Sequence, residues 1–358
     1  MQTLRLHINP ACLDEPQSQS ALDQAAAILR RGGTVALPTE TVYGLGANAL
    51  NPEAVEAIFK AKQRPHWDPL IVHICNVEML TTLVSEIPAS AQQLIDAFWP
   101  GPLTLLLPRS TAVPDAVTAG RPLVGVRMPA HPVAQELIRR GGVPIAAPSA
   151  NRFGHTSPTT AAHVLDDLDG RIDAVLDAGP TSFGLESTVL DPNFSPMVIY
   201  RPGAVTLDQI RAIAGPVELY KEDTTAASKP PEALPSPGVG LRHYAPGARL
   251  ILLELDGDPD SSLVTLESRV SEQTQALSKE RVGLMLPADV PATNFSSGNG
   301  IAAIFPWGNW SNPEELAHRL FAGLRHLDSL GCTVILCPVP SGQGIGIAIR
   351  DRLRKAAT

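Results

Sequence analysis

Short apolar runs and longer, helically spaced apolar stretches alternate along the first 216 residues of the chain. Apolar residues at helical spacing predict helices at 22–29, 52–59, 90–98, 132–140, 158–168 and 207–214, the first capped by Ser20 and the second by Asn51. The short runs predict buried strands at 34–37, 70–74, 103–107, 123–126, 145–147, 174–176, 188–190 and 198–200. Strands and helices mixed in this way predict an α/β domain built on one twisted open sheet with flanking helices.

The rest of the chain repeats this pattern on a smaller scale. Residues 221–237 are polar and proline-rich, which is typical of a linker. Beyond them, strands are expected at 249–255, 282–286, 301–305 and 333–337, with helices at 313–329 and 346–357. We therefore predict a larger domain at 1–216, a linker at 217–246 and a smaller Rossmann-like α/β domain at 247–358.

Composition narrows the function classes. The 358 residues are 44% hydrophobic and 18% charged, with a net charge of −8, so no broad positive field is available to attract nucleic acid. The four cysteines match neither a disulfide framework nor paired zinc ligands. No apolar run is long enough to span a membrane and no signal-peptide core is found near Met1, so a cytoplasmic protein with no membrane partner is expected.

Several common catalytic motifs are missing from the sequence. No glycine-rich segment ends in Gly-Lys-Ser/Thr, and neither a helical His-Glu-x-x-His motif nor a serine-hydrolase elbow occurs. Gly342, Gly344 and Gly346 lie too close together, and too late in the chain, for a dinucleotide fingerprint. Covalent and zinc-dependent mechanisms are thereby disfavoured.

Polar clusters instead follow the predicted strands. Lys62 and Arg64 close a helix, where two cations either cap the helix dipole or clamp a phosphate. Arg127 and Arg201 each end an apolar strand, and a guanidinium in such a place needs an anionic partner. Acidic side chains could supply it, but cations at several element ends fit a polyanionic ligand better than unrelated ion pairs.

Hydroxyl and amide side chains complete the set of candidates. The loop at 38–46, with Thr39 near its start, can present hydroxyls and backbone donors to a small ligand or be no more than a capped turn. Ser149 and Asn151 share one face if the segment is extended, whereas Ser157 is placed to cap a helix. The remaining two candidates, which lie within or beside predicted strands, are His73, a core histidine by default, and Ser187.

Taken in order, these clusters resemble the YrdC-type threonylcarbamoyl-adenylate synthase family, in its long form with a C-terminal domain. Lys62-Gln-Arg64 and Ser149-Ala-Asn151 are similar to the Lys-x-Arg and Ser-x-Asn pair of the family, and 236–246 resembles the element that marks the long form. Arg152-Phe153 departs from the smaller residues usual after the asparagine. The match covers nearly the whole chain.

The resemblance implies that L-threonine, bicarbonate and ATP, with Mg²⁺, are converted to L-threonylcarbamoyladenylate and pyrophosphate. Partner proteins would then transfer the threonylcarbamoyl group to ANN-decoding tRNAs, with tRNA contacts of this chain weak or indirect. Lys62 and Arg64 are implied as catalytic. The residues implied for ATP are Lys62, Arg64, Ser149, Asn151, Ser157, Arg201 and Tyr244, and those for threonine are Thr39, His73, Arg127 and Ser187.

The resemblance also implies a structural role for the segment before the second domain. If Tyr244 reaches the nucleotide, residues 230–246 form a lid over it. The alternatives left open are a non-catalytic module that binds double-stranded RNA or tRNA, and a carbamoyl-transfer or lyase chemistry on the same fold. The absence of a basic half-chain with interleaved aromatic residues disfavours the RNA-binding module.

Overall fold

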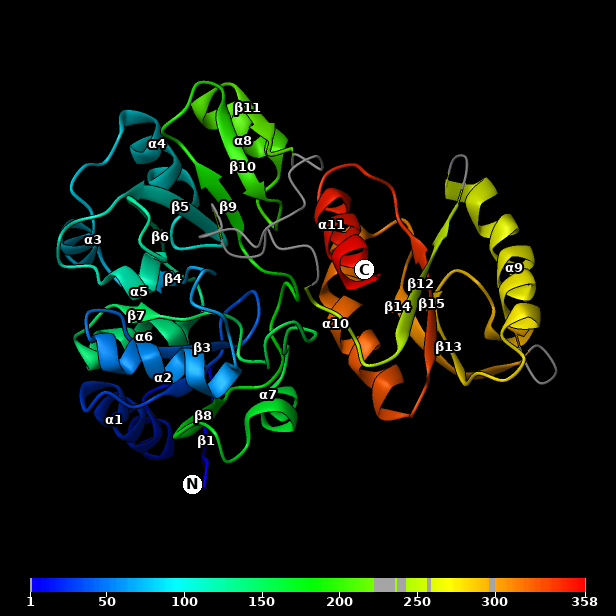
Figure 1. Ribbon diagram of the computed structural model, residues 1–358, viewed down its shortest axis with the longest axis horizontal. Coiled ribbons are helices and arrows are strands. Elements are labelled where there is room, and N and C mark those ends of the chain that lie inside the picture. The colour runs from blue at the N-terminus through cyan, green and yellow to red at the C-terminus, as the bar shows by residue number, and fades with distance from the viewer. Residues whose placement is uncertain (1, 222–235, 237–242, 256–258, 296–299, 358) are drawn as a thin grey trace. The chain divides into compact units, whose positions relative to one another are not determined.

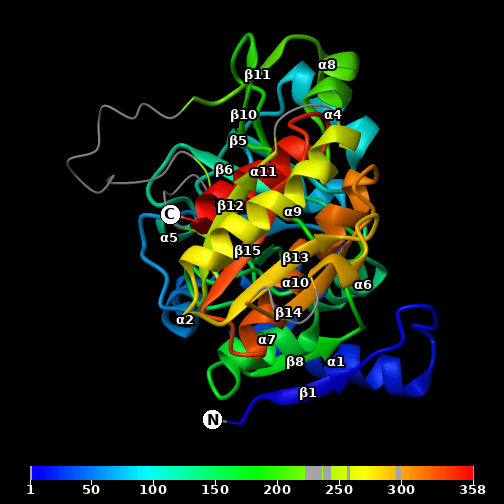
Figure 2. The ribbon, with the colours of Figure 1, turned by 90° about the vertical axis from the view of Figure 1, so that its right-hand side faces the viewer.

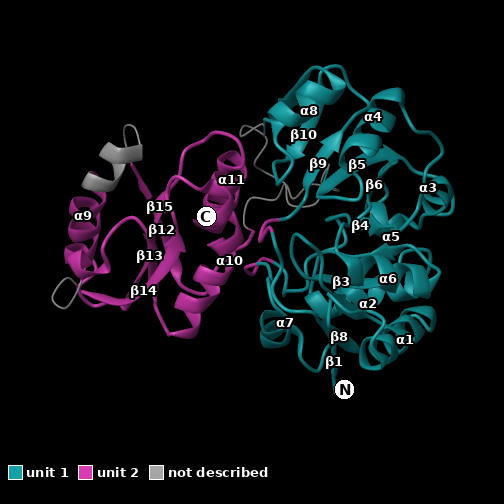
Figure 3. Cartoon of the chain, turned by 180° about the vertical axis from the view of Figure 1, so that it is seen from behind, with its two compact units in different colours: residues 1–153, 157–182, 186–240 teal, residues 154–156, 183–185, 241–358 magenta. Residues whose placement is uncertain are grey.

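The computed structural model describes residues 2–221, 236, 243–255, 259–295 and 300–357 of the chain (Figure 1), and for 259–264 only the backbone. The chain divides into two compact units (Figure 3). The first contains 1–153, 157–182 and 186–240, and the second contains 154–156, 183–185 and 241–358. The division falls within the segment predicted as the linker, while two short segments of the predicted larger domain belong to the second unit.

One mixed sheet forms the centre of the first unit. Its strand order is β1-β8-β2-β3-β7-β4-β6-β5-β9-β10-β11. The strands are β1 (Leu4–His7), β2 (Val35–Leu37), β3 (Gly44–Asn48), β4 (Ile71–His73), β5 (Leu103–Pro108), β6 (Leu123–Arg127), β7 (Ile145–Ala146), β8 (Ala174–Asp177), β9 (Thr188–Asp191), β10 (Met197–Arg201) and β11 (Val217–Leu219). The helices are α1 (Pro16–Arg30), α2 (Pro52–Lys62), α3 (Val77–Leu83), α4 (Ala89–Phe98), α5 (Asp115–Thr118), α6 (Pro132–Gly141), α7 (Ala161–Leu168) and α8 (Leu207–Ala214).

Alternation along the strands sends the apolar side chains of one strand into different clusters of the core. Val35 and Leu37 of β2 pack with the apolar sides of α1 and α6, whereas Ala36 between them belongs to a second cluster that includes residues of α2, α4 and α7. Side chains of a strand point alternately to opposite faces of its sheet. The first unit is therefore an α/β layered fold, as the apolar pattern predicts.

Several boundaries differ from the sequence prediction. Helix α1 begins at Pro16, so Ser20 lies inside it, and α7 begins at Ala161 with Thr160 as its N-cap. The expected loop at 38–46 ends earlier because β3 begins at Gly44 and pairs with β2 and β7. Strand β11 pairs with β10, so the sheet of the first domain continues into the segment predicted as the linker.

The second unit contains an all-parallel four-stranded sheet of order β12-β15-β13-β14. These strands are β12 (Arg249–Glu254), β13 (Val282–Pro287), β14 (Ile301–Gly308) and β15 (Val334–Val339). Helix α9 (Pro259–Ala276) crosses one face of the sheet (Figure 2), and α10 (Pro313–Ser329) and α11 (Gly346–Ala357) cover the other. A parallel sheet with helices on both faces confirms the Rossmann-like prediction. Among the described residues of both units, no helix has the length and apolar character needed to cross a membrane.

Candidate active site

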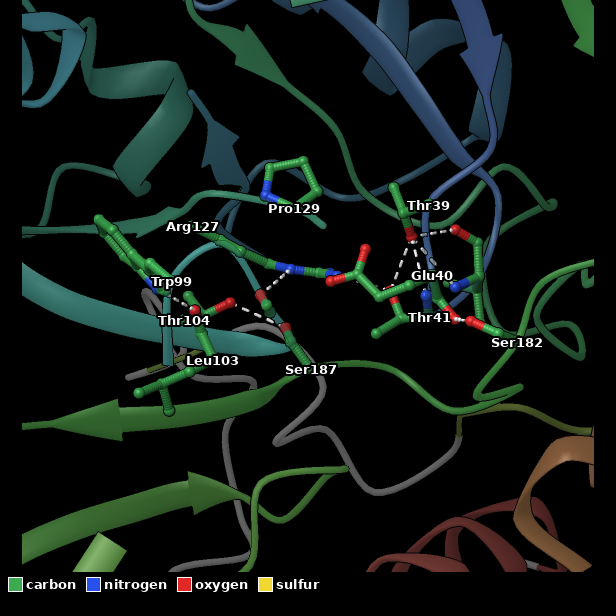
Figure 4. A network of polar contacts seen from close by, with 12 residues as sticks. Thr39, Glu40, Thr41, Trp99, Leu103, Thr104, Arg127, Pro129, Ser182 and Ser187 are labelled. Atoms are coloured by element: carbon green, nitrogen blue, oxygen red, sulfur yellow. Dashed lines mark hydrogen bonds and ion pairs between the residues drawn. The ribbon is translucent and has the colours of Figure 1, made fainter. Parts of the chain in front are cut away.

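Arg127 ends β6 and forms the centre of a buried polar network in the first unit. Its register partner on the parallel strand β4 is His73. Arg127 Nε donates to the Gly101 carbonyl oxygen at 3.1 Å, and Nη1 donates to the Thr41 hydroxyl at 2.9 Å. Arg127 Nη2 lies 2.6 Å from Glu40 Oε1 in a buried ion pair. Figure 4 shows the guanidinium between the turn that carries Glu40 and the pair formed by Thr104 and Ser187.

The two threonines beside Glu40 form a directed chain of hydrogen bonds. Thr39 Oγ1 donates to the Val42 carbonyl oxygen at 2.6 Å and lies 2.7 Å from Thr41 Oγ1. Because a hydroxyl has a single proton, Thr41 donates to Thr39 and accepts from Arg127. The hydroxyl proton of Thr39, a residue assigned to threonine binding, is therefore used within its own loop in this structure.

The charge states in this network follow from burial and from the ion pair. Burial acts to raise the pKa of Glu40, but the positive charge of Arg127 beside it outweighs burial and holds this pKa below its usual value. Burial, together with the charge of Arg127, lowers the pKa of His73 to about 3. At neutral pH, Glu40 is a carboxylate and His73 is a neutral ring that offers hydrogen bonds without charge.

A second buried carboxylate, that of Asp68, is paired with Arg64. Arg64 Nη2 lies 2.9 Å from Asp68 Oδ2, and Arg64 also donates to the carbonyl oxygens of Asp68 and Pro69 at 3.1 and 2.8 Å. Burial raises the pKa of Asp68, while the charges of Arg64, Lys62 and Arg201 oppose that rise. Lys62 and Arg64 are neighbours at the end of α2, whereas Arg201 comes from a distant part of the chain, so the fold places Arg201 within electrostatic reach of the same carboxylate.

The ammonium group of Lys62 organises the loop that follows β7. Lys62 Nζ donates to the carbonyl oxygen of Ser149 at 2.6 Å and to that of Asn151, and the Phe153 amide donates to the Lys62 carbonyl oxygen at 2.9 Å. The same loop is tied to β3 through a bridge between Gly44 and Ser149. Lys62, Ser149 and Asn151, which we assigned to one ligand from the sequence, are thus brought together.

Ser187 contacts both Arg201 and Thr104. Arg201 Nε and Nη2 donate to the Ser187 carbonyl oxygen at 3.1 and 2.9 Å, and Nη2 donates to its hydroxyl at 3.2 Å. The Ser187 hydroxyl lies 2.8 Å from that of Thr104 on β5. This arrangement joins Arg201, which is assigned to ATP, to Ser187, which is assigned to threonine.

Ser157 has a different neighbour from the one that its sequence position indicates. Its hydroxyl donates to Glu186 Oε1 at 2.5 Å, and its side chain is fully buried. Since α7 is capped by Thr160, the interpretation of Ser157 as a helix cap is wrong. Ser157 is instead tied to the segment that leads into Ser187.

Gly203 allows the chain after Arg201 to pass close to this segment, which gives a testable prediction. A Cβ at Gly203 would lie 2.4 Å from the Thr188 amide nitrogen and 2.6 Å from the Glu186 carbonyl oxygen. Because backbone atoms cannot move aside cheaply, Gly203→Ala is expected to lower the free energy of unfolding by about 1–3 kcal/mol in urea denaturation. Gly125→Ala is the control, since its Cβ would come no closer than 3.4 Å to a neighbour, and its effect should stay within about 1 kcal/mol. Equal stability of the two variants would contradict the prediction.

Tyr244 lies in the second unit, where its buried ring packs against two aromatic rings and one guanidinium. The ring centroid is 4.5 Å from that of His243 and 5.7 Å from that of Phe321, and Arg352 Cζ lies 5.0 Å from it. The predicted lid at 230–246 falls largely on 230–235 and 237–242, which lie outside the described residues. The assignment of Tyr244 to ATP therefore stays a prediction.

Several polar residues that contact the candidate site residues were not predicted from the sequence. Asp68 lies four residues after Arg64, and this i,i+4 spacing of opposite charges was available as a signal. Glu40 lies next to Thr39, which was already a candidate. Because a buried arginine needs an anionic partner, Glu40 could have been predicted as the partner of Arg127. Thr104, which was not assigned, has no comparable signal because its partner Ser187 is distant in the sequence.

Chemically, the region offers cations, hydroxyls and a neutral imidazole. Cations fixed before the reaction stabilise negative charge that develops on a bound phosphate or carboxylate. Among the residues that the structure describes, no cluster of three histidine, cysteine or carboxylate side chains is arranged to hold a metal ion. The cations and hydroxyls of this region are suited to positioning an anionic substrate and stabilising its charge.

Comparisons with known proteins agree with this interpretation. A family model of the Sua5/YciO/YrdC type, described as "Telomere recombination", matches residues 27–203. A second model, "Threonylcarbamoyl-AMP synthase, C-terminal domain", matches residues 205–358. The threonylcarbamoyl-AMP synthase of Pyrococcus abyssi is 42% identical over 333 residues, which are 93% of each chain, and that of Bacillus subtilis is 43% identical over 335 residues, which are 93% of this chain and 92% of the relative.

A solved structure extends the similarity to three dimensions. The crystal structure of P. abyssi Sua5 complexed with L-threonine has a TM-score of 0.86 and 40% sequence identity, covering 99% of this chain and 98% of that one. The two family models together with relatives matched over almost their full length show that this chain belongs to the threonylcarbamoyl-AMP synthase family, in the long form that carries both domains.

Proposed function

We propose that this chain is an L-threonylcarbamoyladenylate synthase, which makes threonylcarbamoyl-AMP and pyrophosphate from L-threonine, bicarbonate and ATP. The curated relatives carry this name, and the similar Sua5 structure is described as a complex with L-threonine. The observation that carries the proposal is a pair of buried cations at the end of α2, where Lys62 Nζ donates to the Ser149 carbonyl oxygen at 2.6 Å and Arg64 Nη2 lies 2.9 Å from Asp68 Oδ2. Such a cationic group is suited to the phosphates of a nucleotide.

In the reaction, an oxygen of threonine carbamate attacks the α-phosphorus of ATP. An O–P bond forms there, the bond to the leaving pyrophosphate breaks, and the electron pair stays with pyrophosphate. Lys62 and Arg64 would stabilise charge on the phosphates during this displacement, aided by Arg201. Ser149, Asn151 and Ser157 would orient the nucleotide, and no enzyme nucleophile is needed because the carbamate supplies the attacking atom.

On the amino-acid side, Arg127 is the proposed partner of the threonine carboxylate. A guanidinium recognises a carboxylate through paired N–H groups, and Arg127 is held in place by contacts to all three of its side-chain nitrogens. Neutral His73 and the hydroxyls of Thr39 and Ser187 would contact threonine or its carbamate. Thr39 would have to exchange its bond to Val42 to donate to a substrate.

Magnesium is proposed only as the counter-ion that enters with ATP. Its usual ligands are carboxylate oxygens, water and substrate phosphates. The buried carboxylates of Glu40 and Asp68 are paired with arginines. No residue of the described chain is therefore proposed as a ligand of the magnesium ion.

The product is a reactive mixed anhydride, so a transferase must consume it. We propose that partner proteins transfer its threonylcarbamoyl group to tRNA in the cytoplasm, with only weak or indirect tRNA contact by this chain. The alternative RNA-binding module lacks a supporting observation. It would require tight tRNA binding whose affinity falls steeply with salt concentration.

The test is the release of pyrophosphate from Mg-ATP. Release should require L-threonine and bicarbonate together and should be negligible when either is omitted. Release with ATP alone would indicate a simple ATP pyrophosphohydrolase. Release without bicarbonate would indicate direct adenylation of the amino acid, and either outcome would contradict the proposal.

A further inference from the structure

We propose that Glu40 is a positioning residue, which fixes the guanidinium of Arg127 in the orientation needed to receive the substrate carboxylate. The inference rests on the proposed function, since it presumes that Arg127 receives the carboxylate of threonine. It rests on the place of Glu40 in the network of Figure 4, where its carboxylate faces Arg127 from the turn between Thr39 and Thr41.

Each side-chain nitrogen of Arg127 has a different partner, and Glu40 is the partner of Nη2. Nε is held by the Gly101 carbonyl oxygen, whose residue is itself fixed because the Gly101 amide donates to the Met128 carbonyl oxygen at 2.8 Å. Nη1 is held by Thr41, through the directed chain that ends at Val42. The partner of Nη2 is Glu40, so that together the contacts fix both the position of the guanidinium and its rotation.

Burial makes this contact effective. The side chains of Arg127 and Glu40 are only 4% and 6% exposed, so water does not compete freely for either group. The ionisable groups that interact with Glu40 are Arg127, His73 and His131. Because burial lowers the pKa values of both imidazoles, Arg127 is the positively charged group among these three at neutral pH.

Two substitutions at the same position separate orientation from charge. Glu40→Gln keeps an oxygen acceptor at the same distance along the side chain but removes the negative charge. Glu40→Asp keeps the charge but withdraws the acceptor by about one C–C bond, roughly 1.5 Å. If Glu40 acts by orienting Arg127, the aspartate variant is the more impaired one, whereas a role in charge balance alone predicts the opposite order.

The experiment compares steady-state kinetics of the full-length wild type and both variants, with L-threonine and ATP varied in turn. Glu40→Asp is expected to lower kcat/KM for L-threonine roughly 10- to 100-fold, the effect of a misplacement near 1 Å. The KM for ATP should stay within about twofold of the wild-type value. Glu40→Gln should retain most of the wild-type kcat/KM for L-threonine.

Glu136 offers a matched control. It pairs with Arg139 at the same separation of 2.6 Å and with Arg140 at 2.7 Å, but Arg139 is 64% exposed on the surface of α6. Glu136→Asp and Glu136→Gln should leave both kinetic constants unchanged. The proposal is overturned if Glu40→Gln is as impaired as Glu40→Asp, if neither variant changes kcat/KM for L-threonine, or if ATP and threonine use decline in parallel. Wild-type turnover in the same assay reports separately on the proposed function.

Discussion

Lys62→Met is expected to reduce the formation of threonylcarbamoyl-AMP by about 10²- to 10³-fold, the usual effect of removing one group that stabilises transition-state charge. The substitution preserves an unbranched side chain of similar length and removes the ammonium group. That group holds the carbonyl oxygens of Ser149 and Asn151 and lies within electrostatic reach of Asp68. Product would be measured by mass spectrometry at saturating substrates, and Arg64→Gln should act in the same direction.

Lys60 is the matched control for this prediction. It is exposed on α2, two residues before the buried Lys62. Lys60→Met therefore removes the same charge from the same helix without touching the contacts of Lys62, and it should retain full product formation. Undiminished product from a folded Lys62→Met variant would show that Lys62 has no part in the reaction.

Arg127→Met is expected to lower the free energy of unfolding by about 3–5 kcal/mol, because it leaves the carboxylate of Glu40 buried without its partner. Methionine replaces the volume of the side chain but none of its hydrogen bonds to Gly101 and Thr41. Chemical denaturation of the purified protein, followed by circular dichroism, gives the change.

Two further variants identify the source of this destabilisation. Arg127→Met combined with Glu40→Gln removes both charges, so it should recover part of the lost stability. Arg139→Met removes an exposed guanidinium from Glu136, which keeps its ion pair with Arg140, and should cost less than about 1 kcal/mol. A double variant no more stable than Arg127→Met would show that the unpaired charge is not the cause.

The elements predicted most accurately from the sequence are those set by local signals. Asn51 caps α2 as expected, and α8, α10 and α11 have the predicted bounds because apolar spacing and flanking residues both mark them. Strand β3 was missed because its pairing depends on residues distant in the chain. Its sequence, Gly44-Leu45-Gly46-Ala47-Asn48, is typical of a loop when it is considered alone.

In the candidate site, too, contacts between residues distant in the chain could not be predicted from the sequence. The cations could be identified from the sequence because an arginine or lysine at the end of an apolar element needs a partner. Their partners could not be deduced as easily. Arg201 bonds to Ser187, and Lys62 bonds to backbone oxygens of the loop after β7, contacts that exist only once the sheet has formed. The use of the Thr39 hydroxyl within its own turn depends on hydrogen-bond directions that no sequence pattern specifies.

Under the proposed function, threonine, bicarbonate and ATP are condensed at the polar region of the first unit. Incubation of the full-length chain with L-threonine, Mg-ATP and ¹³C-bicarbonate, followed by rapid mass spectrometry, tests it most directly. The account predicts a threonylcarbamoyl adenylate that carries the heavy carbon and a matching amount of pyrophosphate. Consumption of ATP without a labelled adenylate that contains threonine would contradict it.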